Sequence, residues 1–217
     1  MLSILQSEAG QKKLRSELAR ILSEELKTRV SVGHINWTIV DGVKIKDVYI
    51  EDQQGDTLFF VGDLRARIKL IDSDKHFVFL RKISLDQVHV NFRQYSGDST
   101  FNYVFFFDAL STGKTDTSRA PVIWTLLFEK VQLENTRFRM RIDDDTVTGR
   151  QFRENDMYFT DVHAELRDFY VVDDSLNFYV KELSLKEHNS LEITHMQAKS
   201  VICSKGMYFS DLELETP

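Results

Sequence analysis

The sequence predicts a mainly β fold that is preceded by one α-helix. After residue 30, apolar and polar residues alternate in many short runs, which is typical of strands with one face in water. Turn-forming clusters separate several of these runs, for example at 53–56, 96–98 and 186–190. With 217 residues, 42% hydrophobic and 29% charged, the chain has the composition of a globular protein and not of a disordered segment.

The predicted helix covers residues 7–27 within an N-terminal region, 1–29. Its apolar residues fall at steps of three and four and form one stripe, at Leu14, Leu18, Ile21, Leu22 and Leu26. Charged residues occupy most of the other side. We expect this helix to pack on its own domain; the alternative is a helix that lies on a membrane surface or against a partner.

The strand predictions rest on period-two alternation. The clearest run is 64–70, in which apolar and basic residues alternate. Similar runs lie at 43–50, 83–92, 131–142, 157–166, 178–185, 191–198 and 207–214.

Most of these runs contain a common pattern, which we call the slip frame. Its first and third residues are apolar, its fifth is polar, and its sixth and eighth are apolar, so the alternation moves by one position at the fifth residue. The frame that starts at Val131 departs from this pattern in having Thr136 in the sixth place. A β-bulge or a bend produces such a slip by adding one residue, and we expect the polar residue to bond the backbone that is left unpaired. The nine fifth positions are His34, Asp47, Asp63, Gln87, Asn135, Asp161, Glu182, His195 and Asp211.

One region interrupts the β pattern and divides the strands into two groups. Residues 101–110 are rich in aromatic side chains and predict a short helix. Residues 111–121 form a polar linker that ends at Pro121. We therefore expect a first β sub-module at 30–110 and a second at 122–217, sharing one sheet.

Composition excludes several classes of function. The net charge of −6 argues against a nucleic-acid binder, which needs a basic face. The single cysteine, Cys203, excludes an internal disulfide and a cysteine-based zinc site, and it is expected to be a buried apolar residue. No stretch reaches the roughly 18 apolar residues of a membrane-spanning helix.

No motif predicts catalysis, a metal or a cofactor, so we expect a protein that is not an enzyme. Residues 113–115 resemble the end of a phosphate-binding loop, but Asp108 replaces the glycine that the motif needs. Residues 143–145 lack the ligand spacing of a calcium loop and predict a solvated turn. His188, Glu192 and His195 have the wrong order and spacing for a zinc motif.

The alternating strands imply a sheet with one apolar face, for which two interpretations remain. In the first, the face belongs to an ordinary closed β core. In the second, the sheet is open and curved, and its concave face holds acyl chains. The alternation does not separate them, and on the pattern alone the closed core is preferred.

Several stretches resemble the N-terminal periplasmic part of the TamB family, in the AsmA-like superfamily, and specifically its Bacteroidetes branch. They are 22–35 (LSEELKTRVSVGHI), 45–60 (IKDVYIEDQQGDTLFF), 131–138 (VQLENTRF) and 207–217 (MYFSDLELETP). The stretch that ends in GDTLFF is the most specific. The resemblance implies a long curved antiparallel-type sheet, the β-taco, with an apolar groove, and it implies that this chain is a fragment lying after an inner-membrane anchor.

The resemblance also implies a function. Family members are implicated in phospholipid transport to the outer membrane and in outer-membrane biogenesis with an outer-membrane partner of the Omp85 type. We therefore expect a periplasmic lipid conduit that binds phospholipid acyl chains without a cofactor. The alternative is a β-rich interaction module that docks an outer-membrane assembly partner and carries no lipid. The candidate groove residues are Leu64, Ala66, Ile68, Ile83, Leu85, Val88, Val90 and Phe92.

Overall fold

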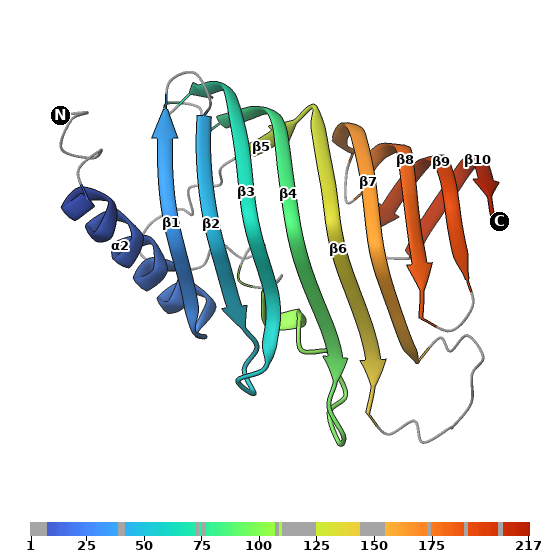
Figure 1. Cartoon of the computed structure of the whole chain (residues 1–217), viewed down its shortest axis with the longest axis horizontal. Coiled ribbons are helices and arrows are strands. Elements are labelled where there is room, and N and C mark those ends of the chain that lie inside the picture. The colour runs from blue at the N-terminus through green and yellow to red at the C-terminus, as the bar shows by residue number, and fades with distance from the viewer. Residues whose placement is uncertain are drawn as a thin grey trace.

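The computed structural model describes residues 8–38, 42–72, 74, 77–106, 109, 125–143, 155–172, 175–188, 191–203 and 206–217. These residues form one long helix, α2 (Glu8–Leu26), followed by ten strands (Figure 1). The strands are β1 (Val30–Thr38), β2 (Gly42–Glu51), β3 (Thr57–Asp72), β4 (Phe77–Gln94), β5 (Thr125–Phe128), β6 (Lys130–Ile142), β7 (Asp156–Val172), β8 (Ser175–Glu187), β9 (Glu192–Cys203) and β10 (Gly206–Glu215).

The strands make one open sheet in the order β1-β2-β3-β4-β6-β7-β8-β9-β10, with β5 beside β4. The predicted mainly β fold with an N-terminal helix and a long curved sheet is confirmed. Most neighbours are antiparallel, but β4 pairs with both β5 and β6 in parallel. β5 and β6 run parallel to β4 because the first residue of β5, Thr125, lies beside Phe77, where β4 begins.

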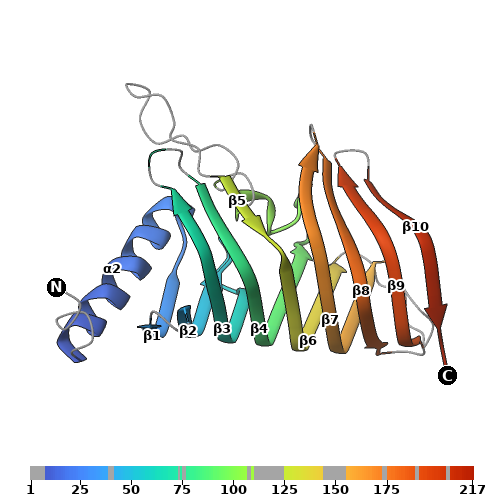
Figure 2. The same ribbon diagram turned by 90° about the horizontal axis from the view of Figure 1, so that it is seen from above.

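The sheet bends into a trough. Figure 2 shows the long strands turning midway, so that the two halves of each strand lie on opposite walls. The slip frame coincides with this bend, since the fifth residue has a positive φ in five of the nine frames. These residues are Asp47 (φ 53°), Gln87 (55°), Asn135 (47°), Asp161 (50°) and Asp211 (51°). Four of the five are Asp or Asn, the residues with short polar side chains that tolerate this conformation best.

The expected extra residue is present in only part of the sheet. The pairing register shifts beside Asn135, Asp161 and Asp211, as a bulge requires. It does not shift beside Asp47 or Gln87, where the ladder stays in register with the strands on either side. In β2 and β4 the bend is therefore made by one left-handed residue without an insertion.

Glycine allows this in-register bend. Gly33 and Gly62 lie opposite the left-handed residues of neighbouring strands. A Cβ atom at Gly33 would lie 2.7 Å from the Cβ of Asp47, and one at Gly62 would lie 2.9 Å from the Cβ of Gln87 and 2.7 Å from its Oε1. All three distances are shorter than van der Waals contact, so the conformations of Asp47 and Gln87 require glycine at positions 33 and 62.

We predict that Gly62→Ala lowers the free energy of unfolding by about 1–2 kcal/mol, because the added methyl group overlaps Gln87. The double variant Gly62→Ala/Gln87→Gly should recover most of this loss. Glycine removes both overlapping atoms and adopts the positive φ at position 87 without strain. Urea unfolding of the wild type, both single variants and the double variant measures the coupling. Additive losses would show that the two positions do not meet as described.

The predicted bonds from the fifth residues to the backbone are wrong for Asn135 and Asp211. The Asn135 amide donates to Asp86 Oδ1 at 2.8 Å, and Asp211 pairs with Lys199 at 2.7 Å. Both bonds join side chains of neighbouring strands. Asn135 and Asp211 therefore cross-link strands, and the conformational tolerance of Asp and Asn explains their presence in the frame.

Helix α2 covers one edge of the sheet. The predicted helix at 7–27 is observed at Glu8–Leu26 and packs against β1. The Arg15 guanidinium donates to the Gly33 carbonyl at 2.5 Å, and the Ser23 hydroxyl accepts from the Val30 amide at 2.9 Å. These bonds satisfy backbone groups of β1, the Gly33 carbonyl and the Val30 amide, at the edge of the described sheet. Among the described residues, no helix has the length and apolar character that crossing a membrane requires.

The region predicted as a short helix at 101–110 contains a helical turn at 104–106. The predicted linker at 111–121, including the loop-like residues 113–115, lies outside the described residues, as does the side chain of Cys203. The two predicted sub-modules meet at the parallel pairing of β4 with β6, within one continuous sheet.

Candidate functional site

The candidate site is the inner face of the trough. Register places Leu64 directly opposite Leu85, and Ala66 opposite Ile83, so these four side chains share a face above the bend. Below the bend, Val88 and Val90 lie opposite Val61 and Phe59. In β4, the left-handed residue Gln87 lies between the two apolar halves and brings them to the same inner surface.

Exposure distinguishes an open trough from a closed core. Of the eight predicted groove residues, only Val88 is buried, with 5% of its surface exposed. Ile68 is 36% exposed, and the other six are half-buried. A closed core would bury most of them, because packed interiors leave little surface to solvent. The preference for a closed core that alternation gives is therefore wrong for the described part of the chain.

A row of phenylalanine rings crosses the inner face below the bend. Phe59, Phe92, Phe138 and Phe159 come from β3, β4, β6 and β7, and neighbouring ring centroids are 5.8, 5.4 and 6.1 Å apart. Only Phe92 was among the predicted groove residues. The other three occupy apolar positions of slip frames, so the frame carried the signal although the candidate list stopped at two strands.

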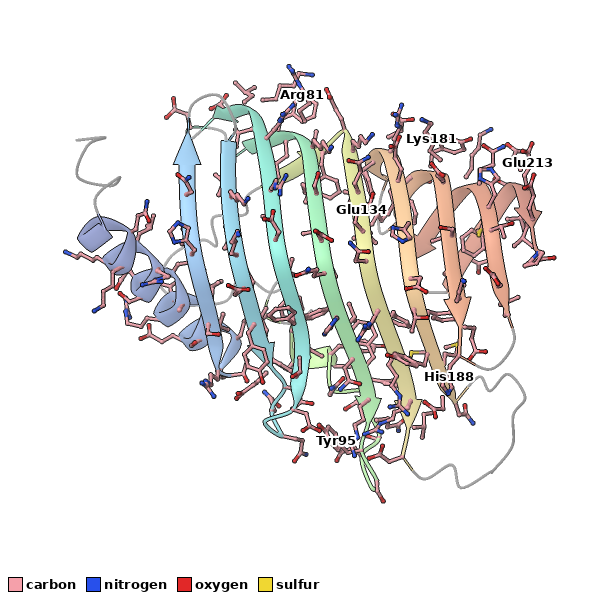
Figure 3. All side chains as sticks on the ribbon, in the orientation of Figure 1. Arg81, Tyr95, Glu134, Lys181, His188 and Glu213 are labelled. Carbon is pink, nitrogen blue, oxygen red and sulfur yellow. The ribbon has the colours of Figure 1, made fainter. Side chains whose placement is uncertain are left out.

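The outer face of the trough is polar. Figure 3 shows nitrogen- and oxygen-bearing side chains on the side of β1–β6 turned to the viewer, including the labelled Glu134. The strongest cross-strand group surrounds Glu165, which binds Lys130 at 2.5 Å, Arg167 at 2.5 Å and Lys181 at 3.4 Å. The hydrogen bond from Lys130 is the main cause that lowers the pKa of Glu165 to about 2. These pairs hold β6, β7 and β8 together on the face away from the trough.

Residues 101–106 cover the lower end of the inner face. The Phe106 ring lies 4.9 Å from Phe59, and the Tyr103 ring lies 4.3 Å from Phe92. Phe101 stacks on Tyr103 at 5.4 Å. We call residues 101–106 the floor segment. It gives the trough one covered end, because it shields part of the phenylalanine row from solvent.

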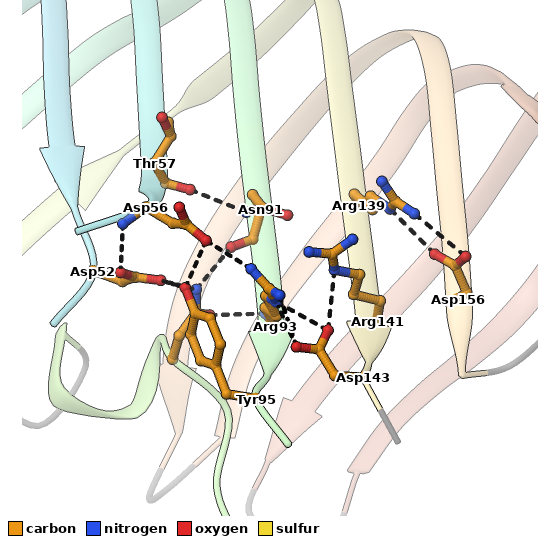
Figure 4. Close-up of polar contacts among 11 residues, drawn as sticks. Asp52, Asp56, Thr57, Asn91, Arg93, Tyr95, Arg139, Arg141, Asp143 and Asp156 are labelled. Carbon is orange, nitrogen blue, oxygen red and sulfur yellow. Dashed lines mark hydrogen bonds and ion pairs between the residues drawn. The ribbon is translucent and has the colours of Figure 1, made fainter. Parts of the chain in front are cut away.

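One carboxylate holds the floor segment in place (Figure 4). Asp52 is 2% exposed and lies in the turn between β2 and β3. Its Oδ1 accepts the amides of Gln54 and Asp56, both at 2.9 Å. Its Oδ2 accepts the Tyr95 hydroxyl at 2.7 Å and the Asn102 amide at 2.8 Å. A single side chain thus joins the β2–β3 turn, the end of β4 and the floor segment.

Asn102 completes the attachment. Its Oδ1 accepts the Arg93 amide at 2.9 Å, and its own backbone amide donates to the Arg93 carbonyl at 2.8 Å. Arg93 also binds both oxygens of Asp143 at 2.9 Å and Asp56 at 2.7 Å. Asp143 was predicted to lie in a solvated turn. It lies in a turn, but its side chain is not solvated, since it is 18% exposed and bound by Arg93. We call Asp52, Asp56, Arg93, Tyr95, Asn102 and Asp143 the end cluster.

The end cluster shifts the pKa values of its members. Burial alone would raise the pKa of Asp52, but the hydrogen bonds from Tyr95, Asn102 and two backbone amides outweigh burial and lower it. Burial raises the pKa of Tyr95, and its bonds to Asp52 and Asp56 raise it further. The hydrogen bond from Arg93 lowers the pKa of Asp143. Asp52 and Asp143 are therefore charged acceptors at neutral pH, and the cluster binds the floor segment in that state.

The described residues contain no group of three or more His, Cys, Asp or Glu side chains that suits a metal ion. What the geometry offers is an apolar surface with one covered end and polar outer walls. Comparison with known proteins adds no identity, since no family model and no curated protein matches the chain.

Proposed function

We propose that this chain is the membrane-proximal part of a lipid conduit and that the inner face of the trough holds phospholipid acyl chains. The observation that carries the proposal is an apolar inner face whose side chains remain half-exposed across several strands. Monomeric proteins rarely leave a large continuous apolar surface in water unless it binds something. The resemblance to AsmA-like proteins supports a periplasmic location, an inner-membrane anchor and an outer-membrane partner of the Omp85 type.

Hydrocarbon chains suit this surface better than other ligands do. Each methylene group that leaves water contributes about 0.8 kcal/mol, so two acyl chains gain many kcal/mol from contact with apolar walls alone. Such apolar contact requires no specific hydrogen bond. The same lack of specific contacts would let a lipid slide along the strands, as a conduit requires.

The test is mass spectrometry of lipid extracted from protein purified without detergent. The wild type should carry phospholipid at a reproducible ratio, and Ile68→Asp should lose most of it. Ile68 is 36% exposed, so an aspartate there stays hydrated in the empty protein but puts a charge where acyl chains lie. Ile21→Asp is the matched control, because Ile21 lies on α2 and is 43% exposed.

Ile21→Asp should keep the wild-type lipid content. Equal lipid in Ile68→Asp and the wild type would contradict the proposal, and so would a wild type that carries no lipid and takes none up from vesicles. Circular dichroism of each variant confirms that the sheet is intact.

The edge of the sheet formed by β10, opposite the edge that α2 covers, favours a second function, that of an interaction module. Strand β10 pairs only with β9 on the described part of the chain, and Tyr208, Phe209, Leu212 and Leu214 are 46–54% exposed. Such an edge can accept a strand from a partner by β-augmentation. A lipid-free wild type that binds an outer-membrane assembly partner through β10 would support the interaction module in place of the conduit.

A further inference from the structure

A hollow of about 350 Å³ lies on the outer face near the upper ends of β1–β4. Four cationic side chains line it, Lys44, Arg65, Arg67 and Lys82, together with Asn36 and Ser84. Register explains why these residues meet: Asn36 pairs with Lys44, Lys44 with Arg65, and Arg67 with Lys82. Because directly paired residues share a face, three strands bring their cations to one place.

The hollow is positively charged although the protein is acidic. Asp63 is the carboxylate that pairs with this group, at 3.1 Å from Lys44 and 2.7 Å from Arg65. Asp86 of β4 is the next carboxylate, and it attracts Arg65 by a Coulomb interaction without forming an ion pair with it. Arg67 and Lys82 form no ion pair with any described residue. Four cations against one bound carboxylate concentrate positive charge in a chain whose net charge is −6.

Apolar side chains lie beside this charge at the same end of the sheet. Ile68 and Leu70 follow Arg67 along β3 and are 36% and 51% exposed. Arg81, next to Lys82, lies at this upper end of the sheet (Figure 3). Cations beside exposed aliphatic side chains are typical of surfaces that contact bilayers, because the cations meet headgroups while the aliphatic groups enter the interface.

We propose that this rim, formed by Lys44, Arg65, Arg67 and Lys82 with Ile68 and Leu70, docks on the anionic phospholipid surface of a bilayer. Charge complementarity selects a phosphate-bearing surface, and the arginine forks match phosphodiester oxygens. The exposed Ile68 and Leu70 favour a bilayer over a free anion, because a dissolved phosphate would leave them in water. Docking brings to the membrane the end of the trough that lies opposite the floor segment.

The inference goes beyond the proposed function and does not depend on it. Ile68 belongs to both surfaces, but the cations that the vesicle experiment changes lie on the outer face, so a trough that carried no lipid would leave their arrangement unchanged. The lipid content of the purified protein and its binding to vesicles are therefore separate readouts.

The experiment is sedimentation of the full chain with vesicles of phosphatidylglycerol and phosphatidylcholine, and with phosphatidylcholine alone. The wild type should bind only the anionic vesicles, and binding should weaken as salt is raised. Arg67→Glu/Lys82→Glu should weaken this binding by roughly 30-fold or more, since each cation near an anionic surface contributes about a factor of five. Arg137→Glu/Lys186→Glu changes the net charge equally on other parts of the sheet and should bind nearly as the wild type does.

Three results would overturn the inference. Equal losses of vesicle binding in the two double variants would show that binding depends on the total charge of the protein and not on the rim. Equal binding to neutral and anionic vesicles would show that the cations play no part. Calorimetric binding of inorganic phosphate that the Arg67→Glu/Lys82→Glu variant loses, with no binding to anionic vesicles, would show that the hollow takes a soluble anion. Should the charge reversals disturb folding, Arg67→Gln/Lys82→Gln provides the same comparison with a smaller expected loss.

Discussion

Replacing Asp52 with alanine is expected to lower the free energy of unfolding by about 3 kcal/mol or more. The buried carboxylate accepts four hydrogen bonds, from Gln54, Tyr95, Asp56 and Asn102. Its removal takes away the side-chain acceptor of the Gln54 and Asp56 amides, while Tyr95 keeps Asp56 Oδ2 at 2.9 Å and Asn102 keeps the Asn91 carbonyl at 3.2 Å. Hydrogen bonds to a charged group contribute about 1.5–3 kcal/mol each, and contributions within one network are not additive. Urea unfolding followed by circular dichroism measures the loss.

The same change should release the floor segment. Hydrogen exchange at 101–106 should accelerate strongly in Asp52→Ala, because Asn102 loses the bond that joins it to the β2–β3 turn. Asp98→Ala is the control, since Asp98 is exposed in the neighbouring turn and its side chain forms no described bond. A stable Asp52→Ala variant whose floor segment remains protected would contradict the role given to the end cluster.

The contribution of Asp52 should depend on pH with a defined sign. Its pKa is lower in the folded protein than in the unfolded chain, where it is about 3.9. Its charge therefore stabilises the fold above that pH, and the stabilisation is lost as the pH falls through the lowered pKa. Asp52→Asn lacks the charge at every pH. The stability difference between the wild type and Asp52→Asn should be largest near pH 6 and should shrink below about pH 4.

The strands and the bend were largely predictable from the sequence, because both depend on local patterns. A strand at the surface of a trough has to alternate, and each bend has to break the alternation. The fifth residues of the slip frame, such as Asp47 and Asn135, therefore marked the bend before any register was known. The in-register bends at Asp47 and Gln87 were not predictable, since they require a glycine on a different strand.

The parallel pairing of β4 with β6 could not be predicted for the same reason. It depends on the route of the chain between Gln94 and Thr125, and local alternation is the same in parallel and antiparallel pairs when one face is wet. The end cluster joins Asp52, Tyr95 and Asn102, which are distant in sequence. From the sequence, residues 53–56 indicated only a turn.

The sequence pattern led to residues of the inner face but not to the rim. The apolar residues of the run 64–70 led to the candidates Leu64, Ala66 and Ile68. Its basic residues, which alternate with them, were interpreted only as the solvent-exposed face of a strand. The positive hollow becomes visible when register brings Lys44 and Lys82 to Arg65 and Arg67. The residues of a cluster that spans three strands have no fixed spacing in the sequence, so no sequence motif identifies it.

The central claim is that lipid lies on the inner face and not on the outer one. Consecutive residues of β3 provide a matched pair for this test. Phe59 contacts Phe92 and Phe106 on the inner face, whereas Phe60 lies opposite Tyr49 and contacts His89 on the outer face. A benzophenone amino acid at either position resembles the native ring and forms a covalent bond with C–H groups that it touches.

The most direct measurement is photocrosslinking of the chain that carries this probe at position 59 or 60, after incubation with radiolabelled phospholipid. Phe60 lies below the cationic hollow and away from the rim, so headgroup binding there does not affect the comparison. The account predicts labelled protein from the probe at position 59, at least tenfold more than from position 60. Equal labelling at the two positions, or labelling at position 60 alone, would contradict an acyl-chain trough on the inner face.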